Sequence, residues 1–105
     1  MLIDANLNES KELLTVKLDG DLDVNSVREL KKCLDEYIDT DKPNVVIDCT
    51  QLNYIDSTGL GALVSALKKV QAYDGSIKIT ALKPYLKKIF EVTGLTKLFE
   101  LEVIS

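Results

Sequence analysis

Residues 45–70 read VVIDCTQLNYIDSTGLGALVSALKKV, and this stretch decides the fold class. It opens with Val45-Val46-Ile47, a continuous β-branched run that is typical of a strand covered on both faces, and therefore of a central strand. After a predicted loop over 50–56, apolar residues recur at spacings of three and four, at Leu60, Leu63, Val64, Leu67 and Val70. They predict an amphipathic helix to about Tyr73, ended by Asp74-Gly75. A buried strand followed by such a helix indicates an α/β unit.

The segments on both sides extend this alternation. Period-two patterns predict strands over 2–7, 12–19, 77–81 and 98–103. Apolar spacings of three and four predict one helix over 25–39, capped by Asn25 or Ser26, and another from Pro84 to Gly94. The order ββαβαβαβ predicts a single α/β domain over 1–105, with a mixed, mostly parallel sheet and three amphipathic helices.

Composition excludes several classes of function. The chain has 105 residues with 13 Lys plus Arg and 17 Asp plus Glu, a net charge of −4, which argues against nucleic acid and anionic membranes as partners. It contains no histidine, so Ser-His-Asp or Cys-His catalysis and imidazole zinc sites are excluded. The longest nearly apolar stretch, 60–67, is far shorter than the roughly 20 residues of a membrane-spanning helix. With no visible signal peptide, we expect a cytoplasmic protein. Cys33 and Cys49 are either joined by one disulfide or free, and two free thiols are favoured.

The segment from Tyr54 to Gly61 is the strongest candidate for a site, because it follows a strand and opens a helix. Ser57 is a candidate helix N-cap. Gly59 and Gly61 are unusual in a first helical turn, where each is disfavoured by up to about 1 kcal/mol relative to Ala. Either they merely shape the turn, or a partner approaches the bare backbone there. The signatures of aspartic proteases, nucleophile elbows and P-loops are absent.

Other charged segments have two interpretations each. Asp21-Leu22-Asp23 is either a solvated acidic turn, with Asp23 facing a helix dipole, or a magnesium site of the phospho-receiver kind, and the first is favoured. The pairs Lys68-Lys69 and Lys87-Lys88 are either solvated helix faces or docking points for an acidic partner.

Three motifs together resemble a known family. They are Gly20-Asp21-Leu22-Asp23, Asp56-Ser57-Thr58-Gly59-Leu60-Gly61, and Phe90-Glu91-Val92-Thr93-Gly94-Leu95 with Phe99. The whole chain resembles a stand-alone anti-sigma factor antagonist of the STAS domain family. The resemblance implies a protein that binds an anti-sigma factor, itself a serine kinase of the GHKL type, and so frees the sigma factor. It also implies that the kinase phosphorylates the serine matching Ser57 and that a PP2C-type phosphatase reverses this.

The resemblance implies a partner surface, and from the residues themselves we expect no catalytic residue, cofactor or metal. The expected surface comprises Asp21, Asp23, Asp56, Ser57, Thr58, Gly59, Leu60 and Gly61. We expect a monomer when unbound. Phosphoserine adds about −1.5 to −2 charge, which a helix N-terminus tolerates but an acidic interface does not. The alternatives are a non-switching STAS subunit of a larger complex, such as a lipid transporter, and a small hydrolase or receiver-like protein.

Overall fold

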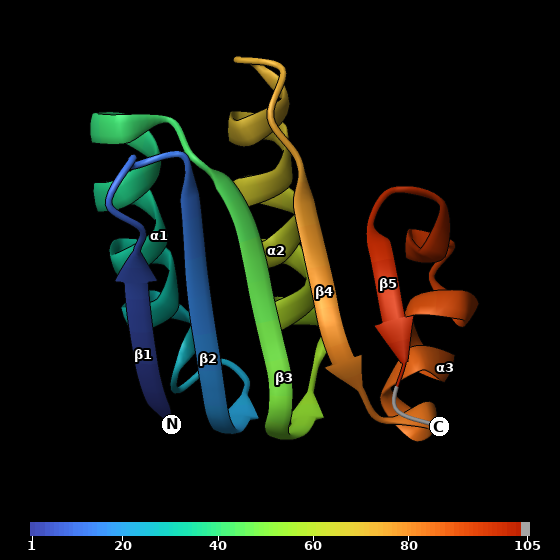
Figure 1. The fold of residues 1–105 in the computed structure, drawn as a ribbon. Coiled ribbons are helices and arrows are strands. Elements are labelled where there is room, and N and C mark those ends of the chain that lie inside the picture. Colours follow the sequence, from blue (N-terminus) through green and yellow to red (C-terminus); the bar gives the residue numbers. More distant parts are fainter. Residues whose placement is uncertain (104–105) are drawn as a thin grey trace.

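Strands and helices alternate along residues 1–103, the part of the chain that the computed structural model describes (Figure 1). The predicted order ββαβαβαβ is confirmed. The elements are β1 (Leu2–Leu7), β2 (Leu13–Leu22), α1 (Val27–Asp41), β3 (Asn44–Ile55), α2 (Ser57–Gln71), β4 (Ile77–Leu82), α3 (Pro84–Val92), the 3₁₀ turn η1 (Leu95–Lys97) and β5 (Glu100–Val103).

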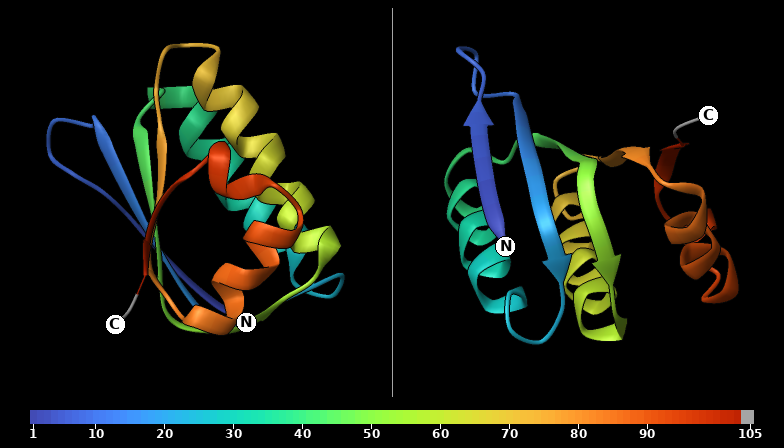
Figure 2. Two further views of the ribbon diagram at one scale, coloured as in Figure 1. Left: turned by 90° about the vertical axis from the view of Figure 1, so that its right-hand side faces the viewer. Right: turned by 90° about the horizontal axis from the view of Figure 1, so that it is seen from below.

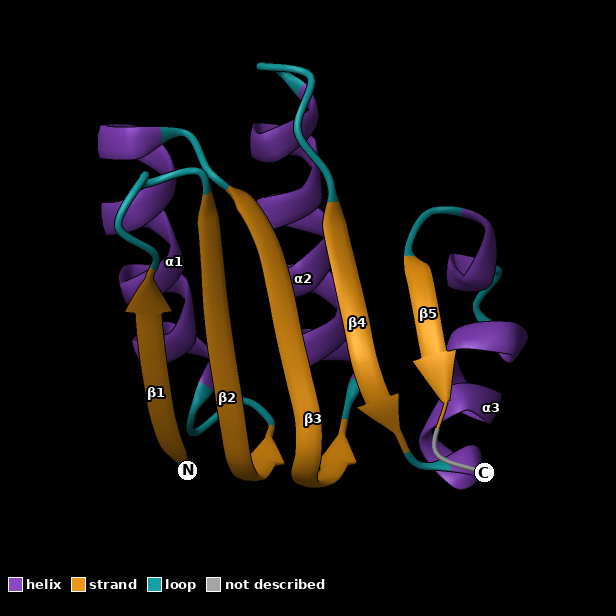
Figure 3. Cartoon of the chain, viewed as in Figure 1, coloured by secondary structure: helices purple, strands orange, loops and turns teal. Residues whose placement is uncertain are grey.

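The strands form one mixed sheet in the order β1-β2-β3-β4-β5 (Figure 3). β1 and β2 are antiparallel, and every later neighbouring pair is parallel, which confirms the predicted mixed, mostly parallel sheet. A short turn joins β1 to β2, where the Asn8 side-chain oxygen accepts from the amides of Glu12 and Leu13 at 3.0 Å each. The parallel pairs have helical crossovers, because a tight turn cannot join parallel strands.

All three α-helices lie on one side of the sheet (Figure 2). On β3, Val45 and Ile47 are buried beneath them, whereas Val46 between them is only half-buried and faces the other side. The expectation that this strand is covered on both faces is therefore wrong. The open face mostly carries polar side chains of the central strands, including Thr15, Lys17, Asp48 and Thr80. β-Branched residues suit such a half-buried pleated surface as well as a core, so their run alone does not show two-sided burial.

Two strands extend several residues beyond their predicted ends, and both extensions lead to the candidate site. β3 continues to Ile55, through most of the segment 50–56 that we expected to be a loop. β2 continues to Leu22, with register shifts against β3 on both sides of Gly20, whose φ is +114°. Other boundaries differ from the prediction by one or two residues. For example, α1 begins at Val27, and β5 begins at Glu100 because η1 precedes it.

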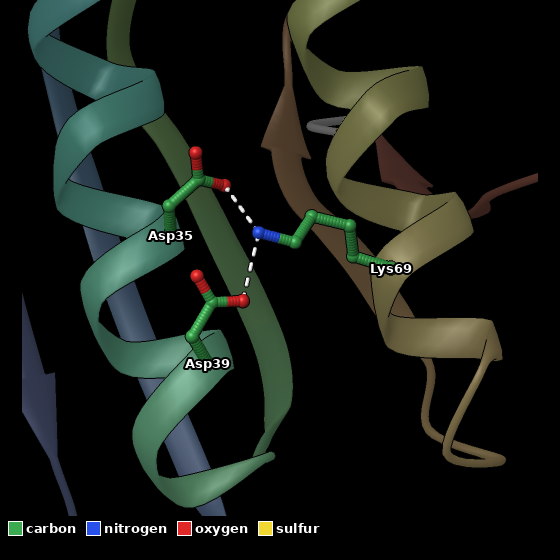
Figure 4. Close-up of polar contacts among 3 residues, drawn as sticks. All are labelled: Asp35, Asp39 and Lys69. Carbon is green, nitrogen blue, oxygen red and sulfur yellow. Dashed lines mark hydrogen bonds and ion pairs between the residues drawn. The ribbon is translucent and has the colours of Figure 1, made fainter.

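Two ion pairs, both made by Lys69 of α2, join this helix to α1 (Figure 4). Nζ of Lys69 lies 3.1 Å from Oδ1 of Asp35 and 2.8 Å from Oδ1 of Asp39. Hydrogen bonds to Asp39 and Asp35 raise the pKa of the Lys69 ammonium. Lys69 therefore contributes to the packing of the two helices and is not simply solvated.

The C-terminal motif contributes to the core. The rings of Phe90 and Phe99 meet edge to face, with centroids 6.0 Å apart, and both side chains are buried. Cys33 and Cys49 are free thiols, half-buried and buried respectively. Within residues 1–103, no helix has both the length and the apolar character needed to cross a membrane.

Candidate functional site

The ends of β2 and β3 bring the two acidic segments together. Asp21 pairs with Tyr54 and Leu22 with Ile55 in the parallel ladder. Beyond the ladder, the amide of Asp56 donates to the carbonyl oxygen of Leu22 at 3.2 Å. The expected site residues of the two strands therefore lie at one edge of the sheet, as the parallel topology requires.

Asp56, and not Ser57, is the N-cap of α2. Its Oδ1 accepts from the amide of Gly59 at 2.8 Å, and Ser57 is the first helical residue. The expectation that Ser57 caps the helix is therefore wrong, although serine and aspartate are comparable caps. Because the Asp56 carboxylate bonds that amide, the Ser57 hydroxyl has no capping bond to maintain. Ser57 and Thr58 are both exposed.

The two glycines of the motif have different environments. A Cβ on Gly59 would lie 2.7 Å from the carbonyl oxygen of Leu22 and 2.8 Å from its Cγ. Gly59 is therefore needed where the first turn of α2 packs against β2, and it is buried instead of presented to a partner. A Cβ on Gly61 would meet nothing within 4 Å, and Gly61 is exposed. Approach by a partner remains a hypothesis for Gly61 only.

Ser26 organises the acidic turn after β2. Its hydroxyl donates to the carbonyl oxygen of Asp21 at 2.7 Å and accepts from the amide of Asp23 at 3.0 Å. Ser26 occupies the N-cap position of α1 as predicted, but its side chain makes no capping bond, because the turn uses it. Asp23 Oδ1 accepts from the amide of Asn25 at 2.9 Å. No group of three or more His, Cys, Asp or Glu within residues 1–103 is placed to hold a metal ion.

A hollow of about 400 Å³ lies beside Ser57. Its lining comes from α2 and from the segment after α3, and comprises Ser57, Leu60, Gly61, Val64, Ser65, Lys68, Thr93 and Leu95. Leu60 retains only 5% of its exposure, so it contributes to the floor of the hollow more than to its rim. Thr93 and Leu95, which belong to the C-terminal motif 90–95, therefore line the same hollow as Ser57.

Two side chains that the sequence analysis missed hold the end of β3. Pairing of β3 with β4 stops at Asp48 and Thr80, so the carbonyls beyond lack ladder partners on that side. Nζ of Lys83 donates to the carbonyl oxygens of Thr50 and Leu52 at 3.0 and 2.6 Å. The hydroxyl of Tyr85 donates to the carbonyl oxygen of Asn53 at 2.5 Å. Lys83 and Tyr85 therefore support the segment that leads to Ser57, and no local motif in the sequence marks them.

The fold and this edge define a small α/β domain with helices on one face and an exposed serine where β3 gives way to α2. The chain belongs to the STAS domain family, whose sequence model matches residues 4–104. An anti-sigma-B factor antagonist of Listeria monocytogenes is 32% identical over 86 residues, which cover 82% of this chain and 75% of the relative. The anti-sigma-B factor antagonist of Staphylococcus aureus is 34% identical over 83 residues, 79% and 77% of the two chains.

Solved structures share the fold. The anti-sigma factor antagonist SpoIIAA in its unphosphorylated form superposes with a TM-score of 0.85 at 18% identity, covering 99% of this chain and 89% of that one. The phosphorylated form of the Bacillus protein SpoIIAA gives a TM-score of 0.77, also at 18% identity, with 99% and 92% covered. At this identity the likeness establishes the fold and does not transfer residue roles.

Proposed function

We propose that this chain is an anti-sigma factor antagonist controlled by phosphorylation of Ser57. In this proposal it binds an anti-sigma factor that is also a serine kinase, and the sigma factor is released. The kinase phosphorylates Ser57, and the complex then dissociates. A PP2C-type phosphatase removes the phosphate, so that the complex can form again. The names of the curated relatives support the first part of this proposal. The chain is then a substrate and partner of enzymes, and not an enzyme itself, and it acts in the cytoplasm.

The exposure of Ser57, the first residue of α2, carries the proposal. A kinase must reach the Ser57 hydroxyl, and no capping bond has to break. The cap bond uses the Gly59 amide, and the Leu60 amide donates to the Asp56 carbonyl. The hydrogen bonds within residues 1–103 leave the amides of Ser57 and Thr58 without a partner, as expected at a helix start. A phosphate on Ser57 would lie at this positive end of the helix, so the domain should remain folded.

The same phosphate opposes binding across an interface. It adds about −1.5 to −2 charge next to the Asp56 carboxylate, on the edge that also carries Asp21 and Asp23. A docked partner would have to accommodate a bulky dianion and desolvate it. A loss of about 3 kcal/mol in binding free energy weakens affinity by more than a hundredfold. The proposed switch therefore acts through interface charge and sterics and leaves the fold unchanged.

Phosphate mapping tests the acceptor. The purified chain is incubated with the anti-sigma factor kinase and ATP, and the modified residue is identified by mass spectrometry. We expect modification of Ser57 and none in Ser57→Ala. Thr58→Ala, which removes the neighbouring exposed hydroxyl, is the matched control and should be phosphorylated normally. Phosphate on another residue, with Ser57→Ala still modified, would refute the assignment.

Binding measurements test the switch. Titration calorimetry with the anti-sigma factor should give similar affinities for wild type and Ser57→Ala, and a much weaker one for the enzymatically phosphorylated protein. Ser57→Asp should weaken binding less, because a carboxylate carries less charge than a phosphate. Equal affinities for the phosphorylated and unmodified proteins would instead favour a non-switching STAS subunit.

A further inference from the structure

The four lysines of the pairs Lys68-Lys69 and Lys87-Lys88 differ in whether they form ion pairs. Lys69 bonds Asp35 and Asp39, and Nζ of Lys87 lies 3.4 Å from Oε1 of Glu91. Lys68 and Lys88 are exposed and belong to none of the ion pairs within residues 1–103. Lys68 and Lys88 are therefore the members of these pairs available to bind an external acid.

Lys68 and Lys88 line two neighbouring hollows. Lys68 belongs to the hollow of about 400 Å³ that begins at Ser57. Lys88 belongs to a second hollow of about 280 Å³ on α3, lined by Tyr85, Lys88, Ile89, Val92 and Thr93. Thr93 lines both, so they form one surface, which we call the α2–α3 groove. Both helices lie on the same side of the sheet (Figure 2).

The α2–α3 groove combines exposed apolar groups with positive charge. Val92 is 79% exposed and Tyr85 56%, although α3 already buries Leu86 and Phe90 on its opposite side. An exposed apolar patch of this kind is typical of an interaction site. The chain carries a net charge of −4, yet the residues that line the two hollows include lysines and no aspartate or glutamate. Charge complementarity therefore favours an apolar segment that carries carboxylates.

We propose that the α2–α3 groove binds an apolar, carboxylate-bearing segment of the anti-sigma factor, with the carboxylates facing Lys68 and Lys88. The proposal rests on the proposed function and names the chemistry of the partner. The groove begins at Ser57, so a segment lying in it has one end against that side chain. A phosphate on Ser57 would repel the same carboxylates that the two lysines attract.

Charge reversal tests the electrostatic part. The affinity of the purified anti-sigma factor is measured by titration calorimetry for Lys68→Glu/Lys88→Glu and for Lys31→Glu/Lys32→Glu. The latter makes the same charge change at two exposed positions on α1. We expect a loss of roughly tenfold or more for the first variant, since like charges then face each other, and less than about threefold for the control. Equal losses, or none, would overturn the proposal.

An apolar-to-polar change tests the packing part. Val92→Ser removes an exposed apolar side chain from the groove, and Leu2→Ser does the same on β1, at 72% exposure. We expect Val92→Ser to weaken binding by about tenfold and Leu2→Ser to leave it unchanged. If both variants bind as wild type, the groove is not the contact surface.

Three results separate this proposal from the proposed function or from other occupants of the groove. Normal phosphorylation of Ser57 combined with undiminished binding of the charge-reversed variant would refute the groove and retain the function. If no anti-sigma factor binds at all, ¹⁵N NMR titration with a synthetic amphipathic helical peptide decides. One peptide has a leucine face flanked by glutamates, and the control peptide is identical except that lysines replace the glutamates. Shifts of the Ser65 and Thr93 amides with the first peptide and not with the control support the groove. The same response to both peptides refutes it. A dimer in sedimentation that Val92→Ser abolishes would assign the groove to a second copy and overturn the choice of partner.

Discussion

Replacement of Gly59 by alanine tests how the site is built. Gly59 lies in the first turn of α2, where a Cβ would meet the carbonyl oxygen of Leu22 at 2.7 Å, Leu22 Cγ at 2.8 Å and Ile55 Cγ1 at 3.0 Å. The nearest of these atoms belongs to the backbone, so no rotamer change of Leu22 relieves that contact. We expect α2 to move away from β2 at this point.

The expected magnitude follows from opposing contributions. Overpacking at a tight site costs about 1–3 kcal/mol. The shift also strains the 3.2 Å hydrogen bond from the Asp56 amide to the Leu22 carbonyl, a bond of a kind worth about 0.5–1.5 kcal/mol. Alanine is favoured over glycine in a helix by about 1 kcal/mol, which offsets part of the cost. The net loss of unfolding free energy for Gly59→Ala should be about 1–3 kcal/mol.

Thermal and urea unfolding followed by circular dichroism measure this loss. A domain of this size should melt about 5–15 °C lower in Gly59→Ala. Gly61→Ala is the matched control, because a Cβ there meets nothing within 4 Å, and it should gain about 0.5–1 kcal/mol of stability. Wild-type stability for Gly59→Ala, or an equal effect of both changes, would refute the packing argument. If Gly61→Ala is stable but binds the anti-sigma factor poorly, the partner approaches the backbone there.

Three further predictions concern single side chains. Asp56→Ala removes the cap of α2 and should lower the unfolding free energy by about 1 kcal/mol in urea, whereas Asp56→Asn should lose little. The Thr50 hydroxyl donates to Asp48 at 2.6 Å and lowers the pKa of that carboxyl, so its stabilisation is present above the unfolded-state value of about 3.9 and is lost as pH falls. The loss of stability in Thr50→Val should therefore be larger at neutral pH than near pH 2, as urea titrations at both would show. Burial raises the pKa of Cys49 to about 12, so iodoacetamide at pH 8 should label half-buried Cys33 well before Cys49 in the folded protein, and both equally in urea, as mass spectrometry would show.

The periodicity of apolar residues predicts α2 and β2, whose burial follows it, and misses the end of β3, whose burial does not. The spacing of apolar residues in α2 and their alternation in β2 predict both elements within a few residues. The end of β3 has a different pattern, with burial at Cys49, Leu52 and Ile55, a spacing of three. Register shifts between β2 and β3 account for the loss of alternation. A single sequence gives no sign of such shifts, so this part of the strand is predicted as a loop.

Sequence patterns also fail to predict the roles of Lys83 and Tyr85, for a related reason. Lys83 and Tyr85 bond carbonyls more than thirty positions earlier in the chain, where β4 no longer pairs with β3. Which carbonyls lack partners depends on where the ladder stops, and that is a property of the assembled sheet. The site residues themselves are predictable because parallel strands must deliver their carboxyl ends to one edge.

The choice of cap determines what a modification of Ser57 can do. A serine that caps a helix uses its side-chain oxygen to accept an amide bond, so a phosphate on that oxygen would alter the helix start. Here the Asp56 carboxylate accepts from the Gly59 amide, and Gly59 lies so close to Leu22 that a Cβ would not fit between them. The helix start is therefore maintained by atoms other than the hydroxyl of Ser57, an exposed residue at the end of the α2–α3 groove. A new charge on that oxygen then acts on whatever lies in the groove, and hardly at all on the domain that carries it.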